Sequence, residues 1–198
     1  SSGKSGAGSS AVQHCFFMVG LLGLVALTGC VILPEGEGSA ASTVQYFEAE
    51  GSLEGTGVGF AGYWTRENQP GVFLQLQTLR NGVVGGEELS DLPPGSGGDP
   101  VTGQEQLGWC LSAGTTWDIN ETCSIHAGLG LGFSETWQEQ FDSDLILGSA
   151  GFYNTSNGQS FDLEACAGAM FKLGNSWVLD TGYNTFSEAL YLGLGYSY

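Results

Sequence analysis

Few side chains in this sequence could do chemistry, and the most reactive of them are thiols. The cysteines are Cys15, Cys30, Cys110, Cys123 and Cys166. Cys110 and Cys123 bracket a short predicted hairpin loop, so their proximity in the sequence favours a disulfide if the chain is exported. Strand parity instead places Cys110 and Cys166 on one face and Cys123 on the other. The pairing therefore stays open, and one of these three thiols is left over.

His126 is the only histidine outside the N-terminal region. A nucleophilic or acid–base site needs a base that a third group orients. The residues that follow His126 are Ala127 and Gly128, and no local cluster of Ser, Asn or carboxylates supplies the missing groups. An inward-facing polar filler is therefore the preferred interpretation of His126.

Three isolated charges, Glu164, Lys172 and Asp180, fall on the inward face of neighbouring predicted strands. Charges in a narrow interior must pair to offset their desolvation, which predicts a structural ion-pair network. The segment 80–104 carries four further acidic residues without the spaced D-x-D-x-D-G order of a calcium loop. They are Glu87, Glu88, Asp91 and Asp99. We therefore expect neither a metal site nor a cofactor.

The elements that must position these residues are strands, because period-two alternation recurs after residue 42 and no 3.6-residue period is sustained. The clearest alternation is at the C-terminus, where one face carries Leu190, Leu192, Leu194, Tyr196 and Tyr198. Runs of about ten residues suit tilted strands that cross a bilayer, whereas strands of soluble sandwiches are nearer five or six residues.

The composition limits both the fold and the partners. Glycine accounts for 34 of 198 residues without a three-residue period, as expected where side chains crowd the inside of a narrow barrel. All 21 acidic residues follow residue 34, where the only basic residues are Arg66, Arg80 and Lys172. Such a chain lacks the cations that displace counterions from a polyanion, so nucleic acid is excluded as a partner.

The segment 15–33, CFFMVGLLGLVALTGCVIL, is the one strongly apolar run. It follows a polar stretch with Lys4 and precedes an acidic Gly-Ser-Ala linker, the layout of a secretory signal. Within it, Leu27-Thr28-Gly29-Cys30 resembles the lipobox of bacterial lipoproteins, a family in which the cysteine is lipidated. The alternative is a later cleavage near 39–41. We expect a signal peptide at 1–29, a linker at 30–41 and a barrel domain at 42–198.

The sequence predicts an odd number of strands. The nine candidates are 42–52, 56–65, 71–79, 105–113, 123–134, 143–153, 161–172, 176–184 and 187–198. Single-chain bacterial barrels have an even number, so one candidate is wrong, and 42–52 or 56–65 is the expected half of a merged strand. The long segment 80–104 should be extracellular by its length, but counting back from the C-terminus places it on the periplasmic side.

The final ten residues, ALYLGLGYSY, resemble the C-terminal assembly signal of outer-membrane barrels, although Tyr198 stands where members of that family usually have Phe. The pattern of 161–198 is similar to the last three strands of small OmpA/OmpX-type barrels. The resemblance implies an all-β fold, an antiparallel up-and-down transmembrane β-barrel of about eight strands. It also implies contact with outer-membrane lipid and insertion by the barrel assembly machinery.

The sequence thus favours a non-enzymatic outer-membrane barrel with a structural or surface-interaction role. One alternative is a lipid-anchored soluble β-barrel that binds an apolar ligand, with its leucines inside. The other is an envelope lipid-modifying enzyme, since small lipid A deacylase and palmitoyl transferase barrels use His with Ser or Glu near the membrane edge. That alternative requires His126 beside a Ser or carboxylate at that edge.

Overall fold

A computed structural model describes residues 38–49, 53–66, 69–85, 87–89, 99–143 and 151–198, all within one compact unit, Glu37–Tyr198. The expected signal peptide 1–29 and the lipidation residue Cys30 lie outside the described residues. The first strand begins at Gly38, a little before the expected start of the barrel domain at 42. Among the described residues, no helix is long and apolar enough to cross a membrane.

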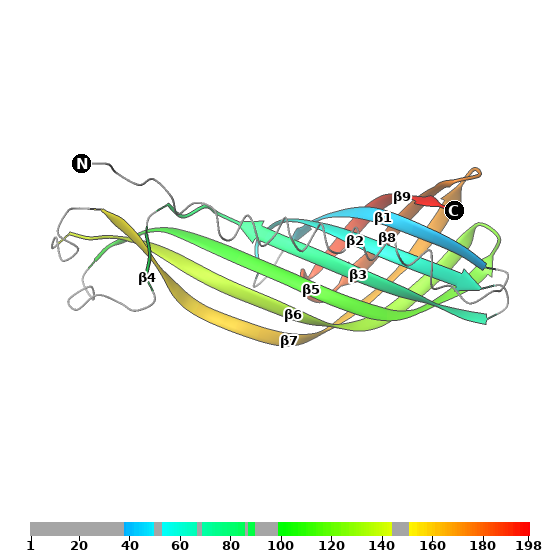
Figure 1. Cartoon of the computed structure of the whole chain (residues 1–198), viewed down its shortest axis with the longest axis horizontal. Helices are drawn as coiled ribbons and strands as arrows, with labels where there is room; N and C mark the ends of the chain where they lie inside the picture. The colour runs from blue at the N-terminus through cyan, green and yellow to red at the C-terminus, as the bar shows by residue number, and fades with distance from the viewer. Residues whose placement is uncertain (1–37, 50–52, 67–68, 86, 90–98, 144–150) are drawn as a thin grey trace, which may run out of the picture. The chain divides into compact units, whose positions relative to one another are not determined.

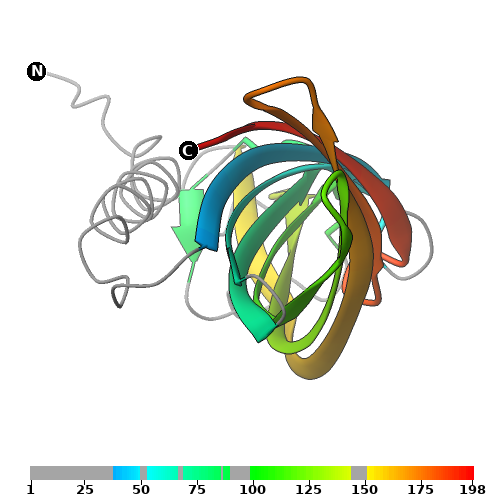
Figure 2. The ribbon, with the colours of Figure 1, turned by 90° about the vertical axis from the view of Figure 1, so that its right-hand side faces the viewer.

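The chain forms a closed antiparallel barrel of eight strands (Figures 1 and 2). Each barrel strand pairs with the next along the chain, β1 also pairs with β9, and β7 pairs with β8, which leaves no open seam. A ninth, short strand, β4, lies outside the ring and pairs in parallel with β7. The strands are β1 Gly38–Ala49, β2 Gly55–Arg66, β3 Gln69–Asn81, β4 Glu87–Leu89, β5 Val101–Asn120, β6 Cys123–Phe141, β7 Phe152–Leu173, β8 Trp177–Asn184 and β9 Ala189–Ser197.

The surplus strand of the sequence prediction is 143–153, and not 42–52 or 56–65. The latter two correspond to β1 and β2, which pair over their whole length. Most of 143–153 lies outside the described residues, and its last two positions are the start of β7. The barrel closes without it, because β6 and β7 are neighbours in the ladder. The apolar run Leu145-Ile146-Leu147, on which that candidate strand rested, lies outside the described residues.

Removal of the surplus strand settles the side of the long connection 82–100. β1 begins and β9 ends at the same end of the barrel, where Tyr198 N–H donates to the Ala40 carbonyl. Because successive strands alternate in direction, the connections after β1, β3, β6 and β8 all leave from the opposite end. We call these the terminal end and the loop end. The long connection is therefore at the loop end, opposite the chain termini, and the count that placed it at the terminal end was wrong.

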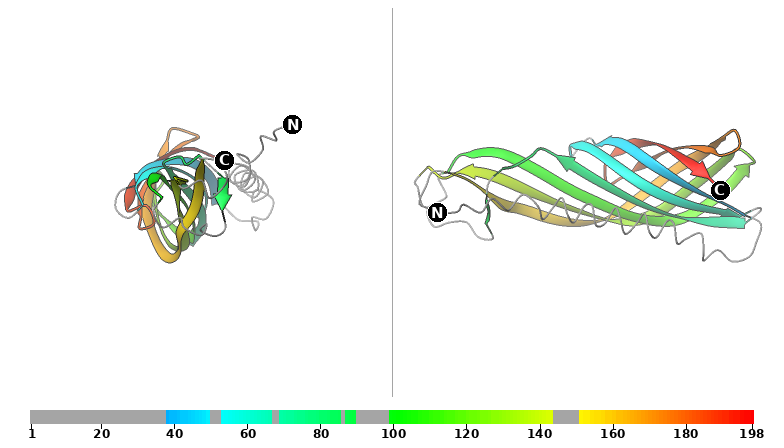
Figure 3. Two further views of the ribbon diagram at one scale, coloured as in Figure 1. Left: turned by 90° about the vertical axis from the view of Figure 1, so that its left-hand side faces the viewer. Right: turned by 45° about the horizontal axis from the view of Figure 1, so that its top comes forward.

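Three strands continue beyond the barrel at the loop end (Figures 1 and 3). β5, β6 and β7 have 20, 19 and 22 residues, whereas β8 and β9 have 8 and 9. β3 ends opposite Gln106, and β8 ends opposite Cys166. The residues beyond these points and beyond the Phe133–Phe161 pair, 101–105, 134–141 and 152–160, form a three-stranded extension that we call the protruding sheet.

The outer face of the barrel is apolar, whereas polar and apolar side chains share the interior. Leu129, Leu131, Leu163 and Leu190 on the outer face are 61%, 62%, 74% and 74% exposed. The buried inward side chains include Gln45, Gln75, Gln77, Asp180 and Asn184. Strands that direct leucines outward are typical of transmembrane barrels, in which lipid solvates the outer face. It is the reverse of the soluble-barrel alternative, which required the leucines inside.

Two groups of aromatic side chains border the outer apolar band. Towards the loop end, Trp109, Phe133 and Phe161 stand side by side on β5, β6 and β7, with ring centroids 5.8 and 4.8 Å apart. Near the terminal end lie Trp117, Trp177, Tyr196 and Tyr198. Trp109 and Trp117 are separated by roughly 26 Å of strand, or about 20 Å across a bilayer at the usual tilt. Aromatic girdles at such a spacing are typical of the two interfaces of a membrane.

Candidate functional site

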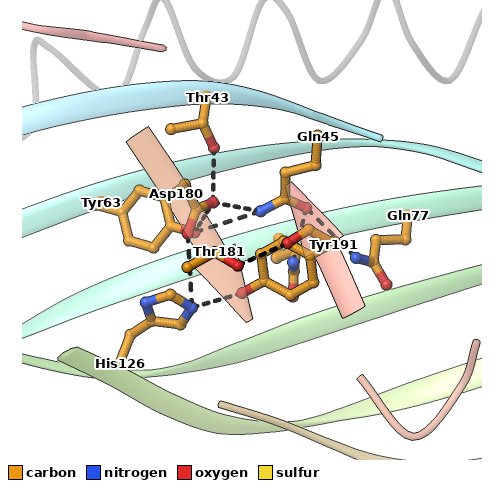
Figure 4. Close-up of polar contacts among 9 residues, drawn as sticks. Thr43, Gln45, Tyr63, Gln77, His126, Asp180, Thr181 and Tyr191 are labelled. Carbon is orange, nitrogen blue, oxygen red and sulfur yellow. Dashed lines mark hydrogen bonds and ion pairs between the residues drawn. The ribbon is translucent and has the colours of Figure 1, made fainter. Parts of the chain in front are cut away.

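The centre of the barrel lumen is organised around the carboxylate of Asp180, on β8. Asp180 is fully buried, and its Oδ2 accepts hydrogen bonds from Thr43 Oγ1 at 3.0 Å, Gln45 Nε2 at 2.7 Å and Tyr63 Oη at 2.7 Å (Figure 4). The three donors come from β1 and β2. Through these three hydrogen bonds, the cluster connects β8 to β1 and β2 across the interior.

His126 lies inside the same lumen. Its Nε2 is 2.6 Å from the Tyr191 hydroxyl and 4.0 Å from Asp180 Oδ1, and its ring packs 5.1 Å from the centroids of both Tyr63 and Phe73. The side chain is completely buried. It therefore does not reach the outer edge of the barrel, where the lipid-modifying alternative needed it beside a Ser or carboxylate.

The structure does not bring the other two predicted lumen charges to Asp180. Glu164 lies beyond the last residue of β8, and its Oε2 accepts a hydrogen bond from the Thr185 hydroxyl. Lys172 is half-buried near the terminal end, opposite Val178. Among the described residues, neither forms an ion pair with Asp180. Neutral donors take the place of the expected ion-pair network.

Sequence reasoning missed these donors, although a signal for them exists. Thr43 and Gln45 alternate with the exposed Val44 and Tyr46 along β1, so parity alone places them inside. What the pattern lacks is the information that Tyr63, on the next strand, reaches the same carboxylate.

Inward-facing glycines on β6 allow large side chains to fill the lumen. A Cβ built on Gly128 would lie 2.8 Å from the Phe73 ring and would also collide with the Ala113 carbonyl. The space above Gly128 is thus taken by a ring from β3. In the described part of the lumen, buried side chains occupy the interior, as in the smallest transmembrane barrels.

The predicted disulfide between Cys110 and Cys123 is not formed, and all three described cysteines are free thiols. Cys123 pairs with Asn120 beside the hairpin turn, whereas Cys110 lies opposite Gly132. About ten residues of strand, roughly 34 Å, separate the two positions, and a disulfide tolerates about 7 Å between Cα atoms. Closeness in the sequence was misleading because the hairpin strands are long.

Carboxylates hold the loop end of the molecule together. Arg80 Nε lies 2.6 Å from Glu105 Oε1, and Glu139 accepts hydrogen bonds from the Gly85 amide and the Thr102 hydroxyl. At the tip, hydrogen bonds from the Tyr153 hydroxyl and from Ser143 hold the pKa of the Asp99 carboxyl below its usual value. These contacts connect the segment 82–100 to the protruding sheet.

One edge of the protruding sheet is open. Residues 156–160 of β7 are all exposed, and they lie between the end of β8 and the three-residue pairing with β4. Among the described residues, no strand pairs with this stretch on its outer side. Unpaired strand edges of this kind are templates for an added strand.

The fold and its polar, filled lumen define a small eight-stranded barrel of the transmembrane type. The sequence matches no family model and no curated protein. Among solved structures, it is similar to Ail, the attachment invasion locus protein of Yersinia pestis, in complex with the heparin analogue sucrose octasulfate. The TM-score is 0.54 at 18% identity over 82% of this chain and 99% of that one. A second structure of Ail gives a TM-score of 0.53 at 18% identity over 83% and 100%. At such identities the likeness shows the fold.

Proposed function

We propose that this chain is a bacterial outer-membrane surface protein, in which the barrel is a closed anchor and the protruding sheet is the interacting part. The observation that carries the proposal is the reversed distribution of side chains, with leucines outside and the Asp180 cluster inside. A lumen filled by buried side chains suits an anchor better than a channel. The protruding sheet lies at the loop end together with the long connection 82–100, and the longer connections of such barrels are extracellular.

The protruding sheet supplies the proposed interaction surface. Its open edge, 156–160, presents backbone donors and acceptors, and such an edge is suited to recognition by strand addition. The acidic side chains Glu135 and Glu139 stand on the neighbouring strand. The ligand in the Ail complex is a sulfated heparin analogue. The net charge of −17 on this chain argues against a sulfated polyanion as its ligand, because a polyanion needs basic partners.

Two further parts of the proposal concern assembly. The five side chains at 190, 192, 194, 196 and 198 all face outward, between 46% and 74% exposed, which suits an assembly signal read by the barrel assembly machinery. Lipidation of Cys30, after cleavage of a signal peptide 1–29, would give the barrel a second attachment to the membrane.

Cysteine labelling of intact cells tests the proposed orientation. In a Cys123→Ser background, Gln159→Cys on the protruding sheet should react with a membrane-impermeant maleimide. Asn175→Cys, in the turn between β7 and β8 at the terminal end, should react after lysis alone. The same background without an added cysteine is the baseline. Labelling of Asn175→Cys, but not Gln159→Cys, on intact cells would refute the orientation and with it the surface role.

A further inference from the structure

A cleft of about 530 Å³ lies where the protruding sheet meets the mouth of the barrel. Its walls are the inward face of β6 and β7 beyond Gly132, together with the connection between β8 and β9. The residues that matter below are Ser160, Asp162, Glu164, Thr185, Phe186 and Glu188. A volume of this size falls in the range of small-molecule sites.

The floor of the cleft combines an aromatic ring with a carboxylate. Phe186, 5% exposed, lies over Gly108 and Gly132 and packs in a buried cluster with Phe47, Leu79 and Tyr191. A Cβ built on Gly132 would lie 2.8 Å from Phe186 Cδ2 and 3.0 Å from Glu164 Cγ. The absence of a side chain at Gly132 thus lets the ring and the carboxylate share the bottom of the cleft.

Glu164 is buried with one oxygen left without a partner. The residue is 8% exposed, and its Oε2 accepts a hydrogen bond from Thr185. Its Oε1 is directed towards the Gly132 side of the cleft, and among the described residues no donor is bonded to it. This oxygen is open to the cleft, so it is available as an acceptor for a donor group of a ligand, and an ammonium group would offset its charge.

The rest of the cleft has the same sign of charge. Asp162 and Glu188 add two carboxylates, and none of the described residues that line the cleft is basic. Asp162 accepts a hydrogen bond from Ser160 and has no ion pair among the described residues. The site therefore carries uncompensated negative charge beside an aromatic ring, which is the environment that attracts an organic ammonium group.

We propose that this cleft binds the primary ammonium group of an organic cation, either a free polyamine or a lysine side chain of a basic peptide. The ammonium group donates to Glu164 Oε1, and the attached carbon chain lies along Phe186. A metal ion fits less well, because no three His, Cys, Asp or Glu among the described residues are close enough to share one. The inference rests on the proposed function in one respect: the cleft must open outside the cell to meet such a ligand.

Isothermal titration of the full-length protein, folded in a zwitterionic detergent, tests the proposal. The probes are spermidine, the peptide acetyl-Gly-Lys-Gly-Lys-amide and calcium chloride. Spermidine or the peptide should bind saturably at one site, and Glu164→Gln should weaken binding by about tenfold or more. Glu164→Gln keeps the acceptor for Thr185, so the local fold is retained. The matched control is Glu139→Gln, which removes the same charge from the protruding sheet outside the cleft lining.

The outcomes separate the possible ligands. Binding of spermidine supports a free polyamine, and binding of the peptide alone supports a lysine side chain. Equal weakening by Glu164→Gln and Glu139→Gln would mean general attraction to an acidic surface and would overturn the site. Stoichiometric calcium binding that displaces spermidine would also overturn it in favour of a metal. Because this titration does not depend on orientation in a cell, the cysteine labelling can refute the surface role while ammonium binding stands.

Discussion

Replacement of Asp180 by Ala is expected to lower the free energy of unfolding by at least about 3 kcal/mol, because each buried donor left unsatisfied costs about 1–3 kcal/mol. Thr43, Gln45 and Tyr63 would all lose their shared acceptor. Their strands, β1 and β2, would also lose the connection to β8 through the lumen. Urea unfolding in phospholipid vesicles, followed by tryptophan fluorescence, measures the loss.

Two variants separate the cluster from a general effect of charge. Asp180→Asn keeps an acceptor oxygen at the same place, so its loss of stability should be smaller than that of Asp180→Ala. Asp162→Ala removes an exposed carboxylate bonded to Ser160 and should change stability by less than about 0.5 kcal/mol. If Asp180→Ala unfolds at the same urea concentration as Asp162→Ala, the lumen cluster does not hold the barrel together.

Gly128→Val should strongly impair assembly of the barrel and lower the folded fraction by more than about tenfold. The new side chain would need space that the Phe73 ring and the Ala113 backbone already occupy. Overpacking in a rigid interior costs about 1–3 kcal/mol and more where backbone must move, and backbone is what stands in the way here. The folded fraction is measured by the protease-resistant band after refolding into vesicles.

The neighbouring residue provides the control for this substitution. Ala127 is exposed on the outer face of the same strand, so the valine side chain of Ala127→Val would extend into lipid and meet no packed neighbour. Both variants introduce the same β-branched residue, which equalises strand propensity. Equal folding of Gly128→Val and Ala127→Val would contradict the inward direction of position 128 and the filled lumen.

The strands and their faces can be predicted from the sequence because the outer face of the barrel meets lipid, whereas the inner face meets a crowded lumen. Leu190, Leu192 and Leu194 alternate with Tyr191 and two glycines, and the structure exposes the former and turns the latter inward. Turn residues such as Gly174, in the left-handed region with φ of 68°, mark where the strands end. Periodicity and turn chemistry are local, so one sequence is enough to find them.

The lumen cluster and the cleft depend on pairings that local patterns do not contain. Tyr63 and Asp180 are 117 residues apart in the chain, and they meet because the ladder closes between β1 and β9. Glu164 carries the inward parity of Asp180, yet it lies beyond the end of β8, so it faces the cleft. Parity indicates the face of a strand, whereas the length of the neighbouring strands decides what that face meets.

The most direct test of a transmembrane barrel is heat modifiability of the Cys30→Ala protein, which lacks the proposed lipid anchor. The membrane fraction is extracted in mild detergent and run on a gel with and without boiling. We predict a band that shifts on boiling and a protein that stays insoluble without detergent, since the outer leucines require lipid or micelle. A Cys30→Ala protein that is soluble in buffer and runs unshifted would contradict the membrane-spanning barrel.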